Sequence, residues 1–240
     1  MNAPKLTNPC NLRGISFVVL TAANPEPLHR LLLGFGFSRT MRHVDRAMDL
    51  YEQGHMRFII DREPKGFAGA FASKHGPSIC AMGWIADNAE HAAAVAVTRG
   101  ARFADGDLDR ADGAQLPAVY GIGDSLIYFV DASDTWTRLG FVPLDRPDLV
   151  AAKGFTAIDH LTNNVPRGEL HTWGNFYKDV FGFTEVRYFD IRGVKTGLQS
   201  YALRSPCGSF CIPINEGTEA KSQINEYLEE YKGPGVQHLA

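Results

Sequence analysis

The sequence contains few cysteines, no long apolar run and no excess of basic residues. Its four cysteines include no Cys-x-x-Cys pair, which favours reduced cysteines in a cytoplasmic protein. No apolar stretch approaches the ~20 residues of a membrane-spanning helix, and the polar segment 1–13 lacks the apolar core of a secretion signal. The net charge of −3 argues against nucleic acid and membranes as partners.

What the sequence does contain is an internal repeat. With 240 residues, the chain is long enough for one large or two ordinary domains. A strand-like run, a helix-like run and a Gly-Phe step occur at 14–20, 25–33 and 34–37, and again at 156–161, 167–181 and 182–183. The second helix is well supported, because its apolar residues recur at the helical period. They are Leu170, Trp173, Tyr177, Val180 and Phe181.

The repeat predicts an α+β fold built from βαβββ units. In the first unit we expect further strands at 48–52, 56–61 and 78–85, and in the last at 187–190, 197–203 and 209–213. A helix at 222–231 and a strand at 236–240 follow. An alanine-rich helix from Ala89 and a strand at 125–131 indicate a middle unit, so the units span about 12–85, 82–142 and 156–240.

Two such units curl a sheet around a cavity, so we expect half-open barrels. Residues 144–154, with two prolines and several charges, are the predicted linker. The domains are therefore 1–150, formed by two units, and 151–240, the first half of a second domain. We expect the N-terminal domain to be complete and the C-terminal domain to be truncated.

Two histidines lie in short apolar runs of strand type, His160 in the first strand and His238 in the last strand of the third unit. The first and last strands of such a unit can be neighbours, so the two imidazoles can converge. Fe(II) oxygenases use two imidazoles and one carboxylate and leave the opposite face of the metal open. By pattern alone, a histidine in an apolar strand is more often a hydrogen-bonded core residue than a metal ligand.

The segment Ile158-Asp159-His160-Leu161-Thr162-Asn163-Asn164-Val165 resembles the first metal segment of the 4-hydroxyphenylpyruvate dioxygenase family, in the vicinal-oxygen-chelate superfamily. The resemblance continues in family order through Asn175-Phe176-Tyr177, Tyr188-Phe189-Asp190-Ile191, Ile212-Pro213-Ile214-Asn215-Glu216, Ser222-Gln223-Ile224 and Gly233-Pro234-Gly235-Val236-Gln237-His238. It is dense from 156 to 240 and looser over the N-terminal domain, as in Lys74-His75-Gly76-Pro77-Ser78.

The resemblance implies a set of site residues. His160 and His238 match the two histidine ligands of Fe(II), and Asp159 and Asn163 flank the first ligand as candidate orienting groups. The implied substrate pocket comprises Ser200, Pro213, Asn215, Gln223 and Gln237, of which Asn215, Gln223 and Gln237 take catalytic roles. The structural alternative is that Ser200 and Asn215 only end strands and Gln223 only caps a helix. The family's third ligand, a glutamate, is expected after Ala240.

The implied reaction converts 4-hydroxyphenylpyruvate and O₂ to homogentisate and CO₂ in tyrosine catabolism. The resemblance makes the protein a cytoplasmic iron dioxygenase, an oxidoreductase, and a homo-oligomer is expected. The N-terminal domain would be non-catalytic. Three alternatives stay open: a 4-hydroxymandelate synthase, which shares fold, ligands and substrate; a binding or assembly module, because the third ligand is absent from this chain; and an extradiol ring-cleaving dioxygenase, whose segments match less well.

Overall fold

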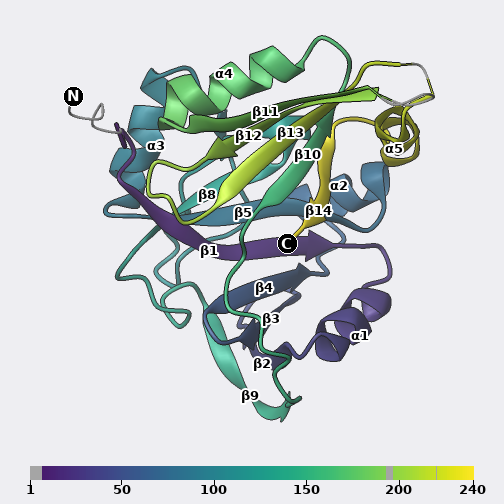
Figure 1. Cartoon of the computed structure of the whole chain (residues 1–240). Helices are drawn as coiled ribbons and strands as arrows, with labels where there is room; N and C mark the ends of the chain where they lie inside the picture. The colour runs from purple at the N-terminus through teal and green to yellow at the C-terminus, as the bar shows by residue number, and fades with distance from the viewer. Residues whose placement is uncertain (1–6, 193–196, 220) are drawn as a thin grey trace.

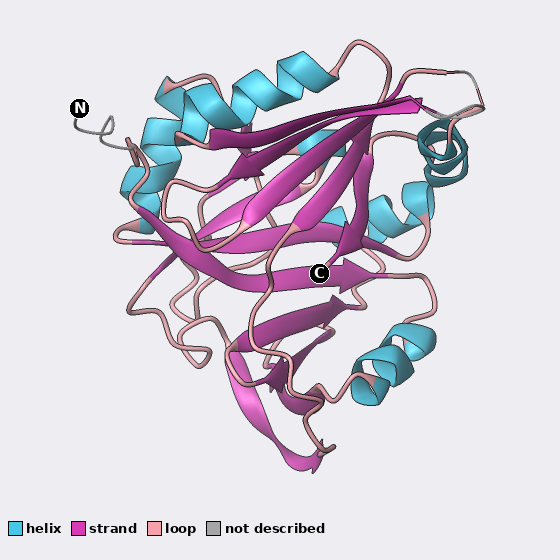
Figure 2. Cartoon of the chain, in the orientation of Figure 1, coloured by secondary structure: helices cyan, strands magenta, loops and turns pink. Residues whose placement is uncertain are grey.

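The computed structural model describes residues 7–192, 197–219 and 221–240 (Figures 1 and 2). Its elements form two mixed β-sheets with helices packed against them. In chain order they are β1 (Leu12–Thr21), α1 (Glu26–Gly34), β2 (Ser38–His43), β3 (Met48–Gln53), β4 (Met56–Asp61), α2 (Phe67–His75), β5 (Ser78–Ala86), α3 (Ala89–Thr98), β6 (Phe103–Ala104), β7 (Ala118–Tyr120), the 3₁₀ turn η1 (Ile122–Asp124), β8 (Leu126–Asp131), β9 (Phe141–Asp148), β10 (Leu161–Val165), α4 (Leu170–Phe181), β11 (Thr184–Arg192), β12 (Gly197–Arg204), β13 (Cys211–Gly217), α5 (Gln223–Tyr231) and β14 (Gly235–Leu239).

The larger sheet has nine strands in the order β6-β7-β8-β5-β1-β4-β3-β2-β9. Two βαβββ units meet in it, because β1 pairs in parallel with β4, β5 pairs in parallel with β8, and β1 and β5 are antiparallel neighbours. The assignment of 78–85 to the end of the first unit was wrong, since β5 opens the second. Sequence analysis missed β2, whose polar Ser38-Arg39-Thr40 start hides any apolar alternation, as well as the short strands β6 and β7. It also missed β9, which occupies the start of the predicted linker at 144–154 because it pairs with β2.

The smaller sheet has five strands in the order β11-β12-β13-β10-β14. Here β10 pairs in parallel with β13 and antiparallel with β14, as β1 does with β4 and β5. The third unit therefore ends at β13, and β14 corresponds to the opening strand of a further unit rather than to the last strand of the third. The α+β fold of repeated units in two curled sheets is confirmed. In the described residues the outermost strands of each sheet are not paired with each other, so neither sheet closes.

The predicted strand at 156–161 is also displaced. The strand β10 begins only at Leu161, and His160 precedes it in an isolated parallel bridge to Cys211. The regular pairing stops there because β13 begins at Cys211 and β14 ends at Leu239. Asp159 and His160 still hydrogen-bond to the backbone of Cys211 or Ala240.

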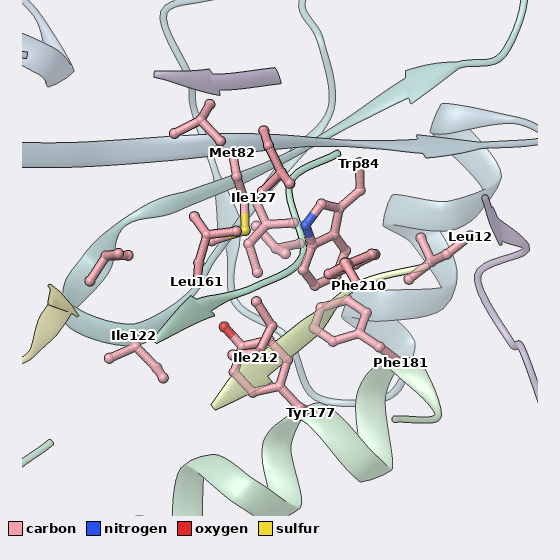
Figure 3. Close-up of a cluster of buried hydrophobic side chains, with 14 of the residues drawn as sticks. Leu12, Met82, Trp84, Ile122, Ile127, Leu161, Tyr177, Phe181, Phe210 and Ile212 are labelled. Atoms are coloured by element: carbon pink, nitrogen blue, oxygen red, sulfur yellow. The ribbon is translucent and has the colours of Figure 1, made fainter. Parts of the chain in front are cut away.

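An aromatic core joins the two sheets (Figure 3). Trp84 of β5 is fully buried, and its ring lies 5.0 Å from that of Phe181 in α4 and 5.4 Å from that of Phe210. The other face of the larger sheet carries a second apolar cluster that includes Phe17, Leu50 and Phe141. None of the described helices is both long and apolar enough to cross a membrane.

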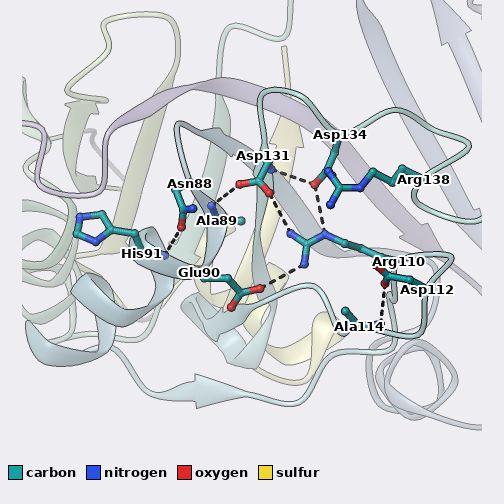
Figure 4. Close-up of polar contacts among 10 residues, drawn as sticks. All are labelled: Asn88, Ala89, Glu90, His91, Arg110, Asp112, Ala114, Asp131, Asp134 and Arg138. Atoms are coloured by element: carbon teal, nitrogen blue, oxygen red, sulfur yellow. Dashed lines mark hydrogen bonds and ion pairs between the residues drawn. The ribbon is translucent and has the colours of Figure 1, made fainter.

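A network of charged side chains surrounds Arg110, near the start of α3 and the end of β8 (Figure 4). The buried guanidinium of Arg110 lies 3.2 Å from Glu90, 3.4 Å from Asp131 and 3.6 Å from Asp134. Asp131 in turn accepts a hydrogen bond from the backbone N–H of Ala89, in the first turn of α3. The network thus fixes α3, whose alanine face packs on the sheet.

Candidate metal centre and substrate pocket

Strand pairing brings His160 and His238 to one face of the smaller sheet. His238 lies opposite Thr162 in the antiparallel pair of β10 and β14. Because side chains alternate along a strand, Thr162 and His160 share a face. His160 extends the pairing, since its carbonyl accepts the N–H of Ala240 and its own N–H donates to the Ala240 carbonyl.

The two rings meet through their Nε2 atoms, which lie 3.3 Å apart. The Nδ1 atoms point away from each other to acceptors: Nδ1 of His160 lies 2.6 Å from Oδ2 of Asp159, and Nδ1 of His238 lies 2.5 Å from Oε1 of Gln237. With the proton on Nδ1, each neutral ring presents its Nε2 lone pair to the same point. Two facing lone pairs repel unless a cation lies between them.

This donor set fits a divalent metal ion. With metal–nitrogen bonds of about 2.1 Å, two adjacent ligands place their nitrogens about 3.0 Å apart at a right angle and about 3.4 Å apart at a tetrahedral angle. The observed 3.3 Å falls in that range. Partial desolvation of the ring and the neighbouring His160 lower the pKa of His238, which favours the neutral form that binds metal.

Within the described residues, no third histidine, cysteine, aspartate or glutamate joins this pair to form a three-ligand group. Asp159 is engaged with Nδ1 of His160, where it orients the ring. Asn163, the other flanking residue, was wrongly expected to help: it is buried, and its amide donates to the Leu161 carbonyl. Its position in β10 puts it on the opposite face from His160.

Beside the histidines, a cavity of about 260 Å³ opens between β13, α5 and β14. Three predicted pocket residues line it together: Asn215 from β13, Gln223 from the start of α5 and Gln237 from β14. Asn164 and Tyr227 also line it, and sequence analysis missed them. Asn164 belongs to the segment 158–165 that resembles the family's first metal segment. Only its pairing with Asn215 shows that its side chain lies on the cavity face of the sheet.

The two remaining predicted residues do not line this cavity. Ser200 lies opposite Asn215 in the pairing of β12 and β13 and is buried, while Pro213 lies between Asn215 and Cys211 along β13. Since Cys211 is bridged to His160, Pro213 occupies the same sheet face, between the histidines and the amides. Along β13, Asn215 lies about 13 Å from Cys211, at about 3.3 Å per residue, whereas on β14 Gln237 both lines the cavity and contacts His238.

Comparison with known proteins identifies the family. Residues 6–140 match the family described as "Hydroxyphenylpyruvate dioxygenase, HPPD, N-terminal". The chain belongs to the hydroxyphenylpyruvate dioxygenase family. It is 49% identical to Protein MelA of Shewanella colwelliana, over 97% of this chain and 68% of MelA. It is 41% identical to 4-hydroxyphenylpyruvate dioxygenase of Legionella pneumophila subsp. pneumophila, over 97% of this chain and 66% of that protein.

The chain therefore spans about two thirds of the length of these relatives. Among solved structures, a triple mutant of 4-hydroxymandelate synthase from Streptomyces coelicolor superimposes with a TM-score of 0.80 at 21% identity, covering 95% of this chain and 70% of that one. At that identity the likeness speaks for the fold alone. The histidine pair and the cavity lie outside residues 6–140.

Proposed function

We propose that this chain carries the two histidine ligands and the ring-binding pocket of an Fe(II)-dependent 4-hydroxyphenylpyruvate dioxygenase, which converts 4-hydroxyphenylpyruvate and O₂ to homogentisate and CO₂ in tyrosine catabolism. Residues 1–150 would form its non-catalytic domain and 151–240 the first half of its catalytic domain. All four cysteines are free, which supports a reducing, cytoplasmic setting. We also propose that the protein forms a homo-oligomer.

The observation that carries this proposal is the pair of Nε2 atoms 3.3 Å apart, with both Nδ1 atoms held by acceptors. Bound Fe(II) supplies the redox chemistry that activates O₂. The chain's own part is to hold two neutral imidazoles in one orientation. Asp159 does so for His160 and Gln237 for His238. The proposed third ligand is a carboxylate from outside residues 1–240.

The pocket suits a 4-hydroxyaryl pyruvate. The amides of Asn215, Gln223 and Gln237 can donate to and accept from a phenolic hydroxyl. Pro213 lies outside this cavity, on the same sheet face between it and the histidines, where it would offer an apolar wall to the ring. Asn215 donates through Nδ2 to the side-chain oxygen of Asn164, 3.3 Å away, which leaves its own oxygen for the ligand. The ring hydroxyl would therefore bind at the amides, with the oxo acid toward the histidines.

Metal titration tests the histidine pair directly. Co(II), an oxygen-stable substitute for Fe(II), should bind the 240-residue chain at one site. His160→Ala and His238→Ala should each abolish that binding, whereas His91→Ala, which removes an exposed imidazole on α3, should not. Equal binding in all three variants would refute the site. No binding by the unaltered chain would instead support a non-catalytic module.

The reaction is tested by the product that the natural protein forms. Homogentisate is expected from 4-hydroxyphenylpyruvate and O₂, and 4-hydroxymandelate would assign the protein to the synthase reaction instead. Since both products come from the same substrate, chromatographic separation of a single incubation decides between them. A variant lacking His160 serves as the background control.

A further inference from the structure

A turn joins α5, which begins with Gln223, to β14, which carries Gln237 and His238. This turn packs against η1 and α2, in the part of the chain formed by the first two units. The backbone turns through Lys232, which has a φ of 62°. The carbonyl of the following Pro234 contacts Gly123 in η1 so closely that a Cβ at position 123 would lie 2.1 Å from its oxygen. Gly123 itself has a φ of 67°, so both the close approach of Pro234 and the positive φ favour glycine at this position.

His75, the last residue of α2, secures the same turn. It is buried, and its Nδ1 lies 2.6 Å from the backbone carbonyl of Tyr231, the last residue of α5. The rings of His75 and Tyr231 are stacked, with centroids 4.4 Å apart and an interplanar angle of 26°. Burial lowers the pKa of His75, so the neutral ring donates its Nδ1–H to a carbonyl that the end of a helix leaves free.

The stack continues from there to the cavity. Tyr227, one turn earlier in α5, stacks on Tyr231 with centroids 4.9 Å apart and an angle of 17°. Its hydroxyl donates to the carbonyl of Val236 in β14 at 2.9 Å, next to Gln237. Tyr227 also lines the cavity with Gln223 and Gln237. A continuous series of contacts therefore runs from His75 in α2 through Tyr231 and Tyr227 in α5 to Val236, the residue before Gln237.

We propose that His75 is a positioning residue: by holding the end of α5, it fixes the wall that carries Gln223, Gln237 and His238. This inference rests on the proposed function for its consequence at the metal, but the docking of the turn stands on geometry alone. The first two units would then do more than stabilise the chain. They would set the angle at which β14 presents its histidine to His160.

Two substitutions separate the contacts of His75. His75→Phe keeps a stacking ring but removes the donor, whereas His75→Asn loses the ring but keeps an N–H donor near the position of Nδ1. By hydrogen–deuterium exchange, amides of 223–239 should exchange about tenfold faster in His75→Phe, with β12 and β13 unchanged. Co(II) affinity should fall about tenfold. His75→Asn should recover most of both losses.

A matched control separates positioning from general destabilisation. Phe141→Leu alters a buried residue of β9, at the opposite end of the larger sheet (Figure 1), and should lower stability without changing Co(II) affinity. Gly123→Ala attacks the same turn from η1 and should reproduce the exchange pattern if the His75 variants fold poorly. Unchanged exchange at 223–239 in both His75→Phe and Gly123→Ala would overturn the proposal. If the unaltered chain binds no Co(II), the metal function fails and the exchange result alone decides this inference.

Discussion

The amide oxygen of Gln237 lies 2.5 Å from Nδ1 of His238, while Gln237 also lines the cavity between β13, α5 and β14. One glutamine therefore contacts both halves of the proposed site. Its oxygen orients a metal-side imidazole, and its amide nitrogen remains available to the pocket. Two neighbouring residues of one strand normally point to opposite faces; the register shift between β10 and β14 next to Thr162 lets both turn to the site.

Replacing Gln237 should weaken metal binding through His238. Gln237→Leu removes the acceptor for Nδ1–H, and we expect Co(II) affinity to fall roughly 10- to 100-fold, as for other partners of metal-bound histidines. Gln237→Glu keeps an acceptor and should retain the affinity. Isothermal titration calorimetry measures both. Gln115→Leu, at an exposed glutamine of the N-terminal part, is the control, and an equal loss there would contradict the assignment.

The sequence predicts part of the fold and of the candidate site, but it does not predict which strands pair. The stripe from Leu170 to Phe181 predicted α4 because its apolar face packs on a sheet, and the two histidines and three pocket amides were found together by their resemblance to one family. The sequence did not predict that β14 starts a new unit, because this depends on β10 pairing in parallel with β13 and antiparallel with β14. For the same reason, the contact of His75 with Tyr231 has no signature in either segment alone.

The core between the two sheets should depend on Trp84. Trp84→Ala removes a fully buried ring that contacts Phe181 and Phe210, and large-to-small changes of this kind cost about 3–5 kcal/mol. Urea unfolding should show a correspondingly lower midpoint. Trp173→Ala, at a half-buried tryptophan of α4, should cost clearly less. Equal losses would mean that the aromatic core does not join the sheets energetically.

Arg110 should be needed for the network around α3. Arg110→Met leaves Asp131 without its cation and the buried Asp134 with Arg138 alone. Removing one partner of a buried ion pair costs about 3 kcal/mol. Thermal unfolding should detect the loss. Arg102→Met, which breaks an exposed pair with Asp124, is the matched control and should change stability by less than about 1 kcal/mol. A similar effect from both would show that burial does not govern these pairs.

Asp61 should make the fold less stable at neutral pH than in mild acid. It is buried at the end of β4, and desolvation raises the pKa of its carboxyl to about 6, above the ordinary 3.8. Between these values the folded chain keeps a proton that the unfolded chain has released. Stability is therefore highest below the unfolded value and is lost as pH rises through about 6.

Asp61→Asn should remove that loss, because the amide is neutral at every pH and its oxygen can still accept the N–H of Glu63, which lies 2.9 Å from Oδ1 in the parent chain. We expect a gain of up to about 3 kcal/mol at pH 7 and almost none at pH 4. Denaturant unfolding at the two pH values measures the difference. Asp105→Asn, at an exposed aspartate, should show no gain at either pH. A gain for Asp61→Asn that is the same at both would exclude its ionisation as the cause.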